Sequence, residues 1–474
     1  MTLGDWTVIG AVLISIAVTP LVVMSVGEAW LLHVVRRVNL GDRLYRDVFF
    51  GAGPAPVWLA ARIVAITRPQ ALVMRAITVA YLGAAWWVAV RTVVTEGAAQ
   101  SASATLGIGL IALGGHHVRM PSHYGLWSSL WVLVAAAAVL GAQPLVGGLA
   151  LAAATAGRYT VGAAAVISLL PSVLVLDGAV AAATTAAGIA LGLGALALVM
   201  GREGVGDFYR GAVANKSAYL TAGSVTPLEG LNRAVPSRGA PKATWLTSVP
   251  TVLGFVVLAA APAGVIVGFV MGITDPNAPA LAGGSLCLVG LSVTYPRCDA
   301  PHVAAATGLA LPGLWLVAEA AGILDGASPT AAAVLSAALV AGLAGVVSRS
   351  RRATLRRDVP RCKGLPVSRH RGVWPDQTDD LRAKTGGTVM VLHDAASFFY
   401  LSGSLINPTP YDYPYASTFG PNGQATTIEG ITSGRIGAVC RGEMDSNLAP
   451  HELLAFVDTM RHVGDTPQGA VFRI

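Results

Sequence analysis

The sequence predicts an α-helical protein that crosses a membrane many times and ends in a small α/β domain. Of its 474 residues, 54% are hydrophobic and only 12% are charged, whereas soluble domains carry roughly 25% charged residues. The mean hydropathy is +0.62. The apolar runs are too long for the strands of a membrane barrel, and their Ala, Gly, Val and Leu content suits helices that pack closely in lipid.

The apolar runs predict about eleven membrane-spanning helices. Two of the runs are short, so the count is open by one or two. The first run has no basic segment before it and no small-residue cleavage site after it, which indicates a membrane span and not a signal peptide. The predicted spans are 6–26, 71–94, 104–115, 126–142, 144–157, 160–176, 179–200, 249–273, 279–295, 303–324 and 328–348.

Polar segments indicate two domains. Residues 1–349 form the predicted membrane domain, which includes one polar loop at 27–70 and another at 201–248. Residues 350–474 form a predicted small soluble domain, because strand patterns alternate there with an amphipathic helix, as in α/β domains. The two strand patterns and the helix pattern lie at 388–393, 435–440 and 450–461.

The polar segments fall on one face of the membrane. With the N-terminus in the cytoplasm, eleven alternating spans place the loops 27–70 and 201–248, Arg158, the segment Tyr295–His302 and the C-terminal domain outside. This orientation conflicts with the rule that basic loops stay inside, because the arginine-rich segment after Val347 is then external. The polar clustering is the stronger argument. A miscounted span reverses the predicted side of the membrane but leaves most of the polar segments together.

The loop 27–70 begins with an amphipathic helix. Trp30 and several Leu and Val residues share one side, whereas His33, Arg36 and Arg37 share the other, with Glu28 at the boundary. This pattern is typical of a helix that lies at the membrane surface with its basic residues toward the lipid headgroups. A structural helix without any chemical role fits the same periodicity.

Three motifs follow one another in this loop: Gly27-Glu28, the turn Gly41–Phe50 and Gly53-Pro54. Across about forty residues, the loop resembles the first extracytoplasmic loop of GT-C glycosyltransferases, in particular the group of protein mannosyltransferases and aminoarabinose transferases. Further segments resemble the same group. They are Ala156–Gly162, Tyr295–His302, Phe399–Gly403, Asn407–Thr409 and Tyr411–Pro414.

The resemblance implies a GT-C-like fold and a plasma-membrane enzyme with its active site on the extracytoplasmic face. Such enzymes transfer a sugar from polyprenyl phosphate to an acceptor hydroxyl with inversion. A carboxylate accepts the hydroxyl proton, and arginine suits the oxygens of the leaving phosphate. The usual first acid aligns with Gly27, so Glu28 and Asp47 are the candidate bases. The candidate donor-phosphate ligands are Arg158, Arg297 and His302, and the supporting residues are Asp299, Tyr45 and Arg46.

No cofactor or metal site is predicted, although a divalent ion stays open. His116, His117 and His123 are assigned to a polar loop, because adjacent histidines rarely bind one ion well and no acidic cluster accompanies them. The expected partners are membrane lipid, the polyprenyl-phosphate sugar and a glycan, lipid or protein acceptor. Nucleic acid is not expected, because the net charge of +7 comes from basic residues between apolar runs. A disulfide between Cys362 and Cys440 is an alternative if the C-terminal domain is external.

Two other classes of protein stay open. A polytopic transporter or lipid flippase places ionisable residues at mid-membrane depth, whereas most apolar runs here lack them, with Arg75 and Glu319 as exceptions. A non-catalytic GT-C-like scaffold is the third interpretation, and Gly27 at the position of the usual base favours it.

Overall fold

Contacts between Cα atoms in a computed structural model divide the chain into two units, and neither is continuous in sequence. The first unit comprises Met1–Pro20, Arg75–Val199 and Val225–Arg351, and the second comprises Leu21–Met74, Met200–Ser224 and Arg352–Ile474. The predicted domain boundary at 349 and 350 lies beside the last of these breaks. The residues that the structure describes are 9, 12–13, 23–66, 70–93, 125–215, 224–236, 242–295, 297–323, 361–363, 365–367, 374, 377–402, 405–446 and 448–474.

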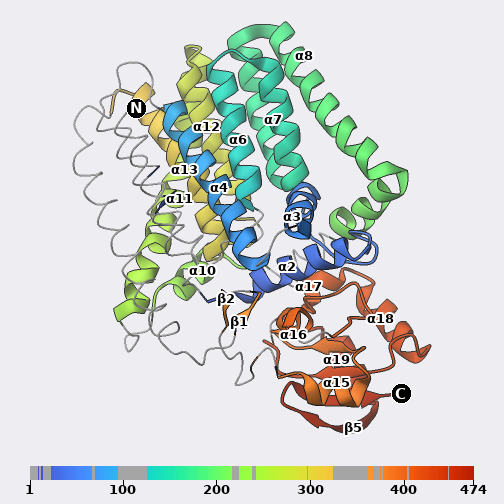
Figure 1. The fold of residues 1–474 in the computed structure, drawn as a ribbon. Coiled ribbons are helices and arrows are strands. Elements are labelled where there is room, and N and C mark those ends of the chain that lie inside the picture. Colours follow the sequence, from blue (N-terminus) through green and yellow to red (C-terminus); the bar gives the residue numbers. More distant parts are fainter. Residues whose placement is uncertain are drawn as a thin grey trace. The chain divides into compact units, whose positions relative to one another are not determined.

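The first unit is built from apolar helices, several of which run side by side (Figure 1). Four helical segments in the described ranges are long and apolar enough to cross a membrane: Gln70–Ala89, Tyr159–Ala214, Thr251–Thr274 and Ala300–Ala320. The helices that contribute to this unit are α4 (Gln70–Val93), α6 (Gly125–Leu140), α7 (Pro144–Gly157), α8 (Tyr159–Phe208), α10 (Pro227–Ala234), α11 (Lys242–Thr274), α12 (Ala278–Val293) and α13 (Ala300–Ala320).

The predicted count of about eleven spans is not confirmed. Helices α6, α7 and α12 coincide with predicted spans, but they have only 16, 14 and 16 residues. At 1.5 Å per residue they are about 21 to 24 Å long, less than the roughly 30 Å of a hydrocarbon core. The predicted spans at 104–115 and 328–348, and about two thirds of 6–26, lie outside the described residues.

Glycines allow the helices of the first unit to approach closely. A Cβ added to Gly148 of α7 would lie 2.1 Å from the carbonyl oxygen of Thr185 in α8, and one added to Gly188 of α8 would lie 2.8 Å from that of Leu145. A Cβ on Gly283 of α12 would lie 2.6 Å from a carbonyl oxygen of α13. Small residues at such contacts are how helices pack without a large apolar side-chain core.

Helix α8 covers two predicted spans and part of a predicted loop. Its φ at Gly178 is +80°, which a regular right-handed helix does not allow, and this residue separates the predicted spans 160–176 and 179–200. The segment 201–248, expected as a polar loop, is largely helical where it is described. Helix α8 continues to Phe208, a π-helical turn η3 follows at Tyr209–Ala214, and α10 begins at a capping box of Thr226 and Glu229.

The second unit joins the loop after the first predicted span to the segment Met200–Ser224 and to Arg352–Ile474, hereafter the tail. It contains a four-stranded mixed sheet in the order β3-β4-β6-β5, in which β3 and β4 are parallel and the other neighbours are antiparallel. Strand β3 lies within the predicted strand at 388–393, β4 overlaps the end of the one at 435–440, and α19 lies within the predicted helix at 450–461. The strands are β1 (Arg361–Cys362), β2 (Leu365–Pro366), β3 (Met390–Leu392), β4 (Val439–Arg441), β5 (Arg461–Thr466) and β6 (Gly469–Arg473).

Helices cover this sheet and join it to the loop. Helix α2 packs against α3 and against α16 of the tail. Cys362 and Cys440 are both buried, and no disulfide joins them. The helices are α2 (Val26–Asn39), α3 (Ala55–Ile66), α15 (Asp379–Thr385), α16 (Ala396–Ser402), α17 (Ala416–Phe419), α18 (Gly423–Thr432) and α19 (His451–Val457).

Candidate active site

The turn after α2 is held in an unusual backbone conformation. Tyr45 has φ of +73°, a left-handed conformation that costs a non-glycine residue about 1 to 3 kcal/mol and is most common at functional sites. Its side chain keeps it there, because the hydroxyl donates to the carbonyl of Ala52 at 2.6 Å and the ring packs edge-on against Phe208 at 5.1 Å. The turn is therefore a fixed structure and not a loose loop.

Asp47, one candidate base, lies in this turn with its carboxylate partly exposed. One carboxylate oxygen accepts the backbone N–H of Arg43 at 2.9 Å, and the guanidinium of Arg46 lies 3.8 Å from the other. The carbonyl of Asp47 accepts a hydrogen bond from Arg37 at 2.7 Å. The side chain is 41% exposed, so it is positioned by its neighbours and still open to a substrate.

Glu28, the other candidate base, has a different environment. It lies in the first turn of α2, where its backbone N–H donates to the side chain of Ser25 at 3.2 Å. Glu28 is only 2% exposed. Glu28 is therefore far less accessible than Asp47, whose side chain is 41% exposed.

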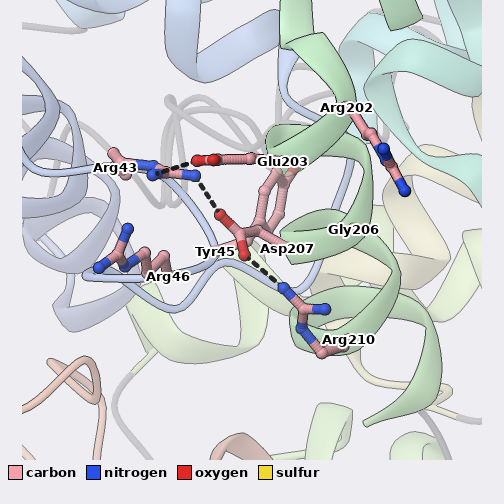
Figure 2. A pocket seen from close by; sticks show the side chains of 8 residues that line it. All are labelled: Arg43, Tyr45, Arg46, Arg202, Glu203, Gly206, Asp207 and Arg210. Atoms are coloured by element: carbon pink, nitrogen blue, oxygen red, sulfur yellow. Dashed lines mark hydrogen bonds and ion pairs between the residues drawn. The ribbon is translucent and has the colours of Figure 1, made fainter.

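Arginine and acidic side chains surround a pocket of about 880 Å³ beside the turn (Figure 2). The guanidinium of Arg43 lies 2.9 Å from the carboxylate of Glu203 and 2.7 Å from that of Asp207. Asp207 also pairs with Arg210 at 2.8 Å. The pocket is lined by Arg43, Tyr45, Arg46, Arg202, Glu203, Gly206, Asp207 and Arg210.

A second pocket of about 510 Å³ shares several of these side chains. It adds the apolar surfaces of Val38, Leu44, Trp58 and Met200 to the charged groups. An apolar wall with a few charged groups is the usual composition of a small-molecule site. The turn therefore has a charged pocket and a more apolar one beside each other, both within the second unit.

The basic side of α2 is covered by the tail. His33 Nε2 lies 3.3 Å from a carboxylate oxygen of Asp412, and Arg37 Nη1 donates to the same oxygen at 3.1 Å. Arg37 also pairs with Asp42 at 2.6 Å and donates to the carbonyl of Thr409. The prediction that this side of the helix meets lipid headgroups is wrong, because an acidic residue of the tail takes that place.

The buried ion pair between α2 and the tail shifts the pKa of both partners. Burial raises the pKa of the Asp412 carboxyl, but the charges of His33 and Arg37 outweigh it and the net shift is downward. Burial lowers the pKa of Arg37, and the carboxylates of Asp412 and Asp42 more than reverse that effect. Both groups are therefore held in their charged forms, as a buried pair requires.

The tail aromatics pack within the second unit. The ring of Tyr411 lies 4.4 Å from that of Phe419, and Tyr413 lies 4.2 Å from Tyr415 in an edge-on contact. Tyr413 also lies 5.8 Å from Trp30 of α2. These contacts are those of aromatic side chains that pack inside a domain.

The donor-phosphate candidates lie in the first unit. Arg158 ends α7, is 6% exposed, and donates from Nη2 to the carbonyl of Val293 at 3.2 Å. Its other terminal nitrogen, Nη1, is buried and has no hydrogen-bond partner among the described residues. A buried guanidinium nitrogen without an acceptor is costly, so the role of Arg158 as a ligand of the donor phosphate stays a prediction that this geometry permits.

Asp299 joins the other two candidates. It pairs with Arg297, and one of its oxygens lies 2.5 Å from His302 Nδ1. Burial raises the pKa of Asp299, but His302 and Arg297 outweigh it, so the net shift is downward. The predicted group of Arg297, Asp299 and His302 is therefore brought together by direct contacts.

The predicted site residues separate into two groups. The second unit contains Glu28, Tyr45, Arg46 and Asp47. The first unit contains Arg158, Arg297, Asp299 and His302. The pocket residues on α8 and η3 were not among the predicted site residues. Their spacing, four residues from Glu203 to Asp207 and three more to Arg210, places all three on one helical face, but the expectation of a loop concealed that signal.

No protein-family model matches the chain, and neither does any curated protein. The fold, however, is similar to that of solved structures. The crystal structure of ArnT from Cupriavidus metallidurans in the apo state aligns with a TM-score of 0.52 and 14% sequence identity, over 98% of this chain and 97% of ArnT. The chain has the ArnT fold. The structure of ArnT bound to undecaprenyl phosphate gives a TM-score of 0.50 and 13% identity over the same shares.

The predicted resemblance to aminoarabinose transferases therefore agrees with the fold that this chain shares with ArnT. The archaeal oligosaccharyltransferase AglB from Archaeoglobus fulgidus, in complex with an inhibitory peptide and a dolichol-phosphate, aligns with a TM-score of 0.47 and 12% identity over 99% of this chain and 74% of AglB. In the part of the chain that the structure describes, no three His, Cys, Asp or Glu side chains are placed to hold a metal ion.

Proposed function

We propose that the protein is a membrane glycosyltransferase that transfers a sugar from a polyprenyl-phosphate donor to an acceptor hydroxyl, with inversion, on the extracytoplasmic face of the plasma membrane. The observation that carries the proposal is Arg158, a buried guanidinium whose Nη1 has no hydrogen-bond partner in the described ranges. The ArnT fold supports it, because ArnT has been crystallised with undecaprenyl phosphate.

In the proposed reaction the acceptor oxygen attacks the anomeric carbon of the sugar. The bond from that carbon to the phosphate oxygen breaks, and polyprenyl phosphate leaves with the electron pair. A carboxylate takes the proton of the acceptor hydroxyl. Asp47 is accessible for this role, and Glu28 is the alternative, protected from water by its burial.

The leaving phosphate gains negative charge as the bond breaks. Arg158 would donate to it from Nη1 while Nη2 stays bound to the carbonyl of Val293, and charge-assisted hydrogen bonds of this kind are among the strongest in proteins. Arg297 and His302 would complete the phosphate site. Asp299 contacts both side chains, so its proposed role is to orient them, and Tyr45 and Arg46 would support the turn that carries Asp47.

Transfer of labelled sugar from polyprenyl phosphate by the purified protein in lipid nanodiscs tests the proposal. Glu28→Gln and Asp47→Asn identify the base, because loss of a general base lowers kcat by roughly 100- to 10,000-fold. Glu429→Gln is the matched control, since this tail glutamate is 76% exposed. If neither candidate variant lowers kcat while the wild type is active, the assignment of the catalytic loop is wrong.

The phosphate site has its own test. Arg158→Gln should raise the KM for the donor and lower kcat, and Arg435→Gln, an exposed arginine of the tail, is the control. An Arg158→Gln enzyme with unchanged donor KM and kcat would remove Arg158 from the site. If the wild type transfers no sugar from any polyprenyl-phosphate donor, the proposed function fails and the scaffold interpretation gains support.

A further inference from the structure

The pocket beside the turn carries an excess of positive charge. Four arginines line it, Arg43, Arg46, Arg202 and Arg210, against the two carboxylates of Glu203 and Asp207. Figure 2 shows Arg46 and Arg202 apart from the ion-paired chain of Glu203, Arg43, Asp207 and Arg210. Among the described residues Arg202 has no ion pair, so the charge of the pocket is not balanced from within.

The two acids that occupy the pocket are held with different strength. Asp207 is buried, with a side chain only 10% exposed, and it bridges Arg43 and Arg210. Glu203 is 80% exposed, and its ion pair in the described part of the chain is with Arg43. Exposed ion pairs are weak, so an incoming anion can replace Glu203 at Arg43 at small cost, whereas Asp207 stays.

One residue of the pocket, Arg43, is hydrogen-bonded to a candidate base. Arg43 lines the pocket with its guanidinium, and its backbone N–H is bound to the carboxylate of Asp47 at 2.9 Å. Tyr45 fixes the same turn against Phe208 and closely approaches Gly211 of the π-helical turn η3. Such turns are frequent at functional sites. A group held in the pocket would thus keep a defined position relative to Asp47.

We propose that this pocket binds an anionic group, a phosphate or a carboxylate, carried by the acceptor. The inference rests on the proposed function, in which the donor phosphate belongs to Arg158 in the other unit. A base must meet the acceptor hydroxyl in a fixed geometry, and the acceptor is therefore anchored by the unit that carries the base. The acceptor is accordingly an anionic lipid or an anionic soluble glycan.

The chemistry of the pocket fits such a ligand. Guanidinium groups bind phosphate and carboxylate through paired hydrogen bonds, and here they approach from two chain segments, the turn 43–46 and the helical segment 202–210. A volume of about 880 Å³ accommodates a sugar phosphate or a lipid headgroup. The adjoining pocket offers Trp58 and Leu44 to the uncharged part of the molecule.

Binding of glucose 1-phosphate to the full chain in phosphatidylcholine nanodiscs tests the anion site without relying on catalysis. Arg202→Gln and Arg210→Gln should each weaken binding by about tenfold or more, the effect of losing one charge-assisted hydrogen bond. Glu203→Gln should tighten binding several-fold, because it removes the competing carboxylate. A purely structural ion-pair network predicts no gain for that variant.

The matched controls are Glu229→Gln and Arg233→Gln, an exposed ion pair of α10 at 3.2 Å, and both should bind like the wild type. Because Arg210 and Glu203 are 73% and 80% exposed, their variants should fold normally, which the thermal unfolding midpoint checks. Binding that is unchanged in Arg202→Gln and Arg210→Gln, or weakened in Glu203→Gln, overturns the anion site.

Two further measurements separate the sources of the anion and the two substrates. Competition by phosphatidylglycerol added to the nanodiscs identifies a lipid headgroup as the ligand, and absence of competition identifies a soluble glycan. In the transfer assay Arg210→Gln should raise the KM for an anionic acceptor and leave the KM for the donor unchanged. The reverse result assigns the pocket to the donor and overturns the proposal. An inactive wild type that still binds glucose 1-phosphate refutes only the proposed function.

Discussion

Replacing Asp412 with asparagine removes the charge that joins the tail to α2. The carboxylate is fully buried and accepts hydrogen bonds from Arg37 at 3.1 Å and from Asn407 at 2.9 Å, with His33 at 3.3 Å. Asparagine keeps the size of the side chain and one acceptor oxygen. It leaves the guanidinium of Arg37, only 13% exposed, with Asp42 as its remaining acidic partner among the described residues.

The expected loss of stability is about 3 to 5 kcal/mol for the contact between the tail and α2, the usual cost of removing one partner from a buried ion pair. Since tenfold in an equilibrium constant corresponds to 1.4 kcal/mol, hydrogen-exchange protection of 26–39 and 396–413 should fall by roughly two to three and a half orders of magnitude. Protection of α12 and α13 in the first unit should change far less.

Hydrogen exchange read by mass spectrometry on the protein in nanodiscs measures this loss segment by segment. Glu429→Gln is the control, since it removes an exposed carboxylate that pairs with Arg435 at 3.6 Å. A double-mutant cycle with Arg37→Gln should give a coupling energy above about 1 kcal/mol. Protection within threefold of the wild type in Asp412→Asn would refute the view that this ion pair holds the tail to the loop.

Three further outcomes are expected. Because the folded-state pKa of Asp412 is depressed, the stabilisation by its ion pair is present above about pH 4, the ordinary pKa of aspartate. This stabilisation is lost as the pH falls through the folded-state pKa. Acid should therefore reduce hydrogen-exchange protection of α2 more in the wild type than in Asp412→Asn. Gly188→Ala should destabilise the first unit by about 1 to 3 kcal/mol through overpacking, whereas Gly194→Ala, which has open space around its Cβ, should not; thermal unfolding compares them. Tyr45→Phe loses one buried hydrogen bond, about 1 kcal/mol, and should lower protection of the turn 41–50 only.

The apolar pattern predicted helix positions well where a single apolar run forms a single helix. The run at 71–94 corresponds to α4 at Gln70–Val93, and the run at 126–142 corresponds to α6. The pattern failed where a polar, charged segment is also helical. Residues 201–214 are rich in charge and continue as helix, because charged side chains such as Glu203, which is 80% exposed, can face water from a helix as well as from a loop.

The polar face of α2 could not be assigned from local sequence. A helix with Leu and Val on one side and His33, Arg36 and Arg37 on the other is the same pattern whether lipid headgroups or a protein carboxylate cover it. The deciding residue, Asp412, lies 375 positions from Arg37. Local periodicity contains no information about such a partner.

The candidate site was predicted in part for the same reason. Arg297, Asp299 and His302 are close in sequence and in contact in the structure, so a short motif was sufficient to find them. The pocket residue Arg43 meets Glu203, which is 160 positions away. Pairs of that kind become visible only in the folded chain, and they changed the view of the turn from a catalytic loop alone to a loop with its own charged pocket.

The separation of Arg37 from Asp412 also sets an order of events during synthesis. Arg37 of α2 is made first, and its acidic partner Asp412 follows 375 residues later. At translation rates of about 5 to 20 residues per second, His33 and Arg37 wait roughly 20 to 75 s for Asp412. During that interval Asp42, five residues from Arg37, is the counter-charge at hand, and Asp412 joins it only when the tail has been made.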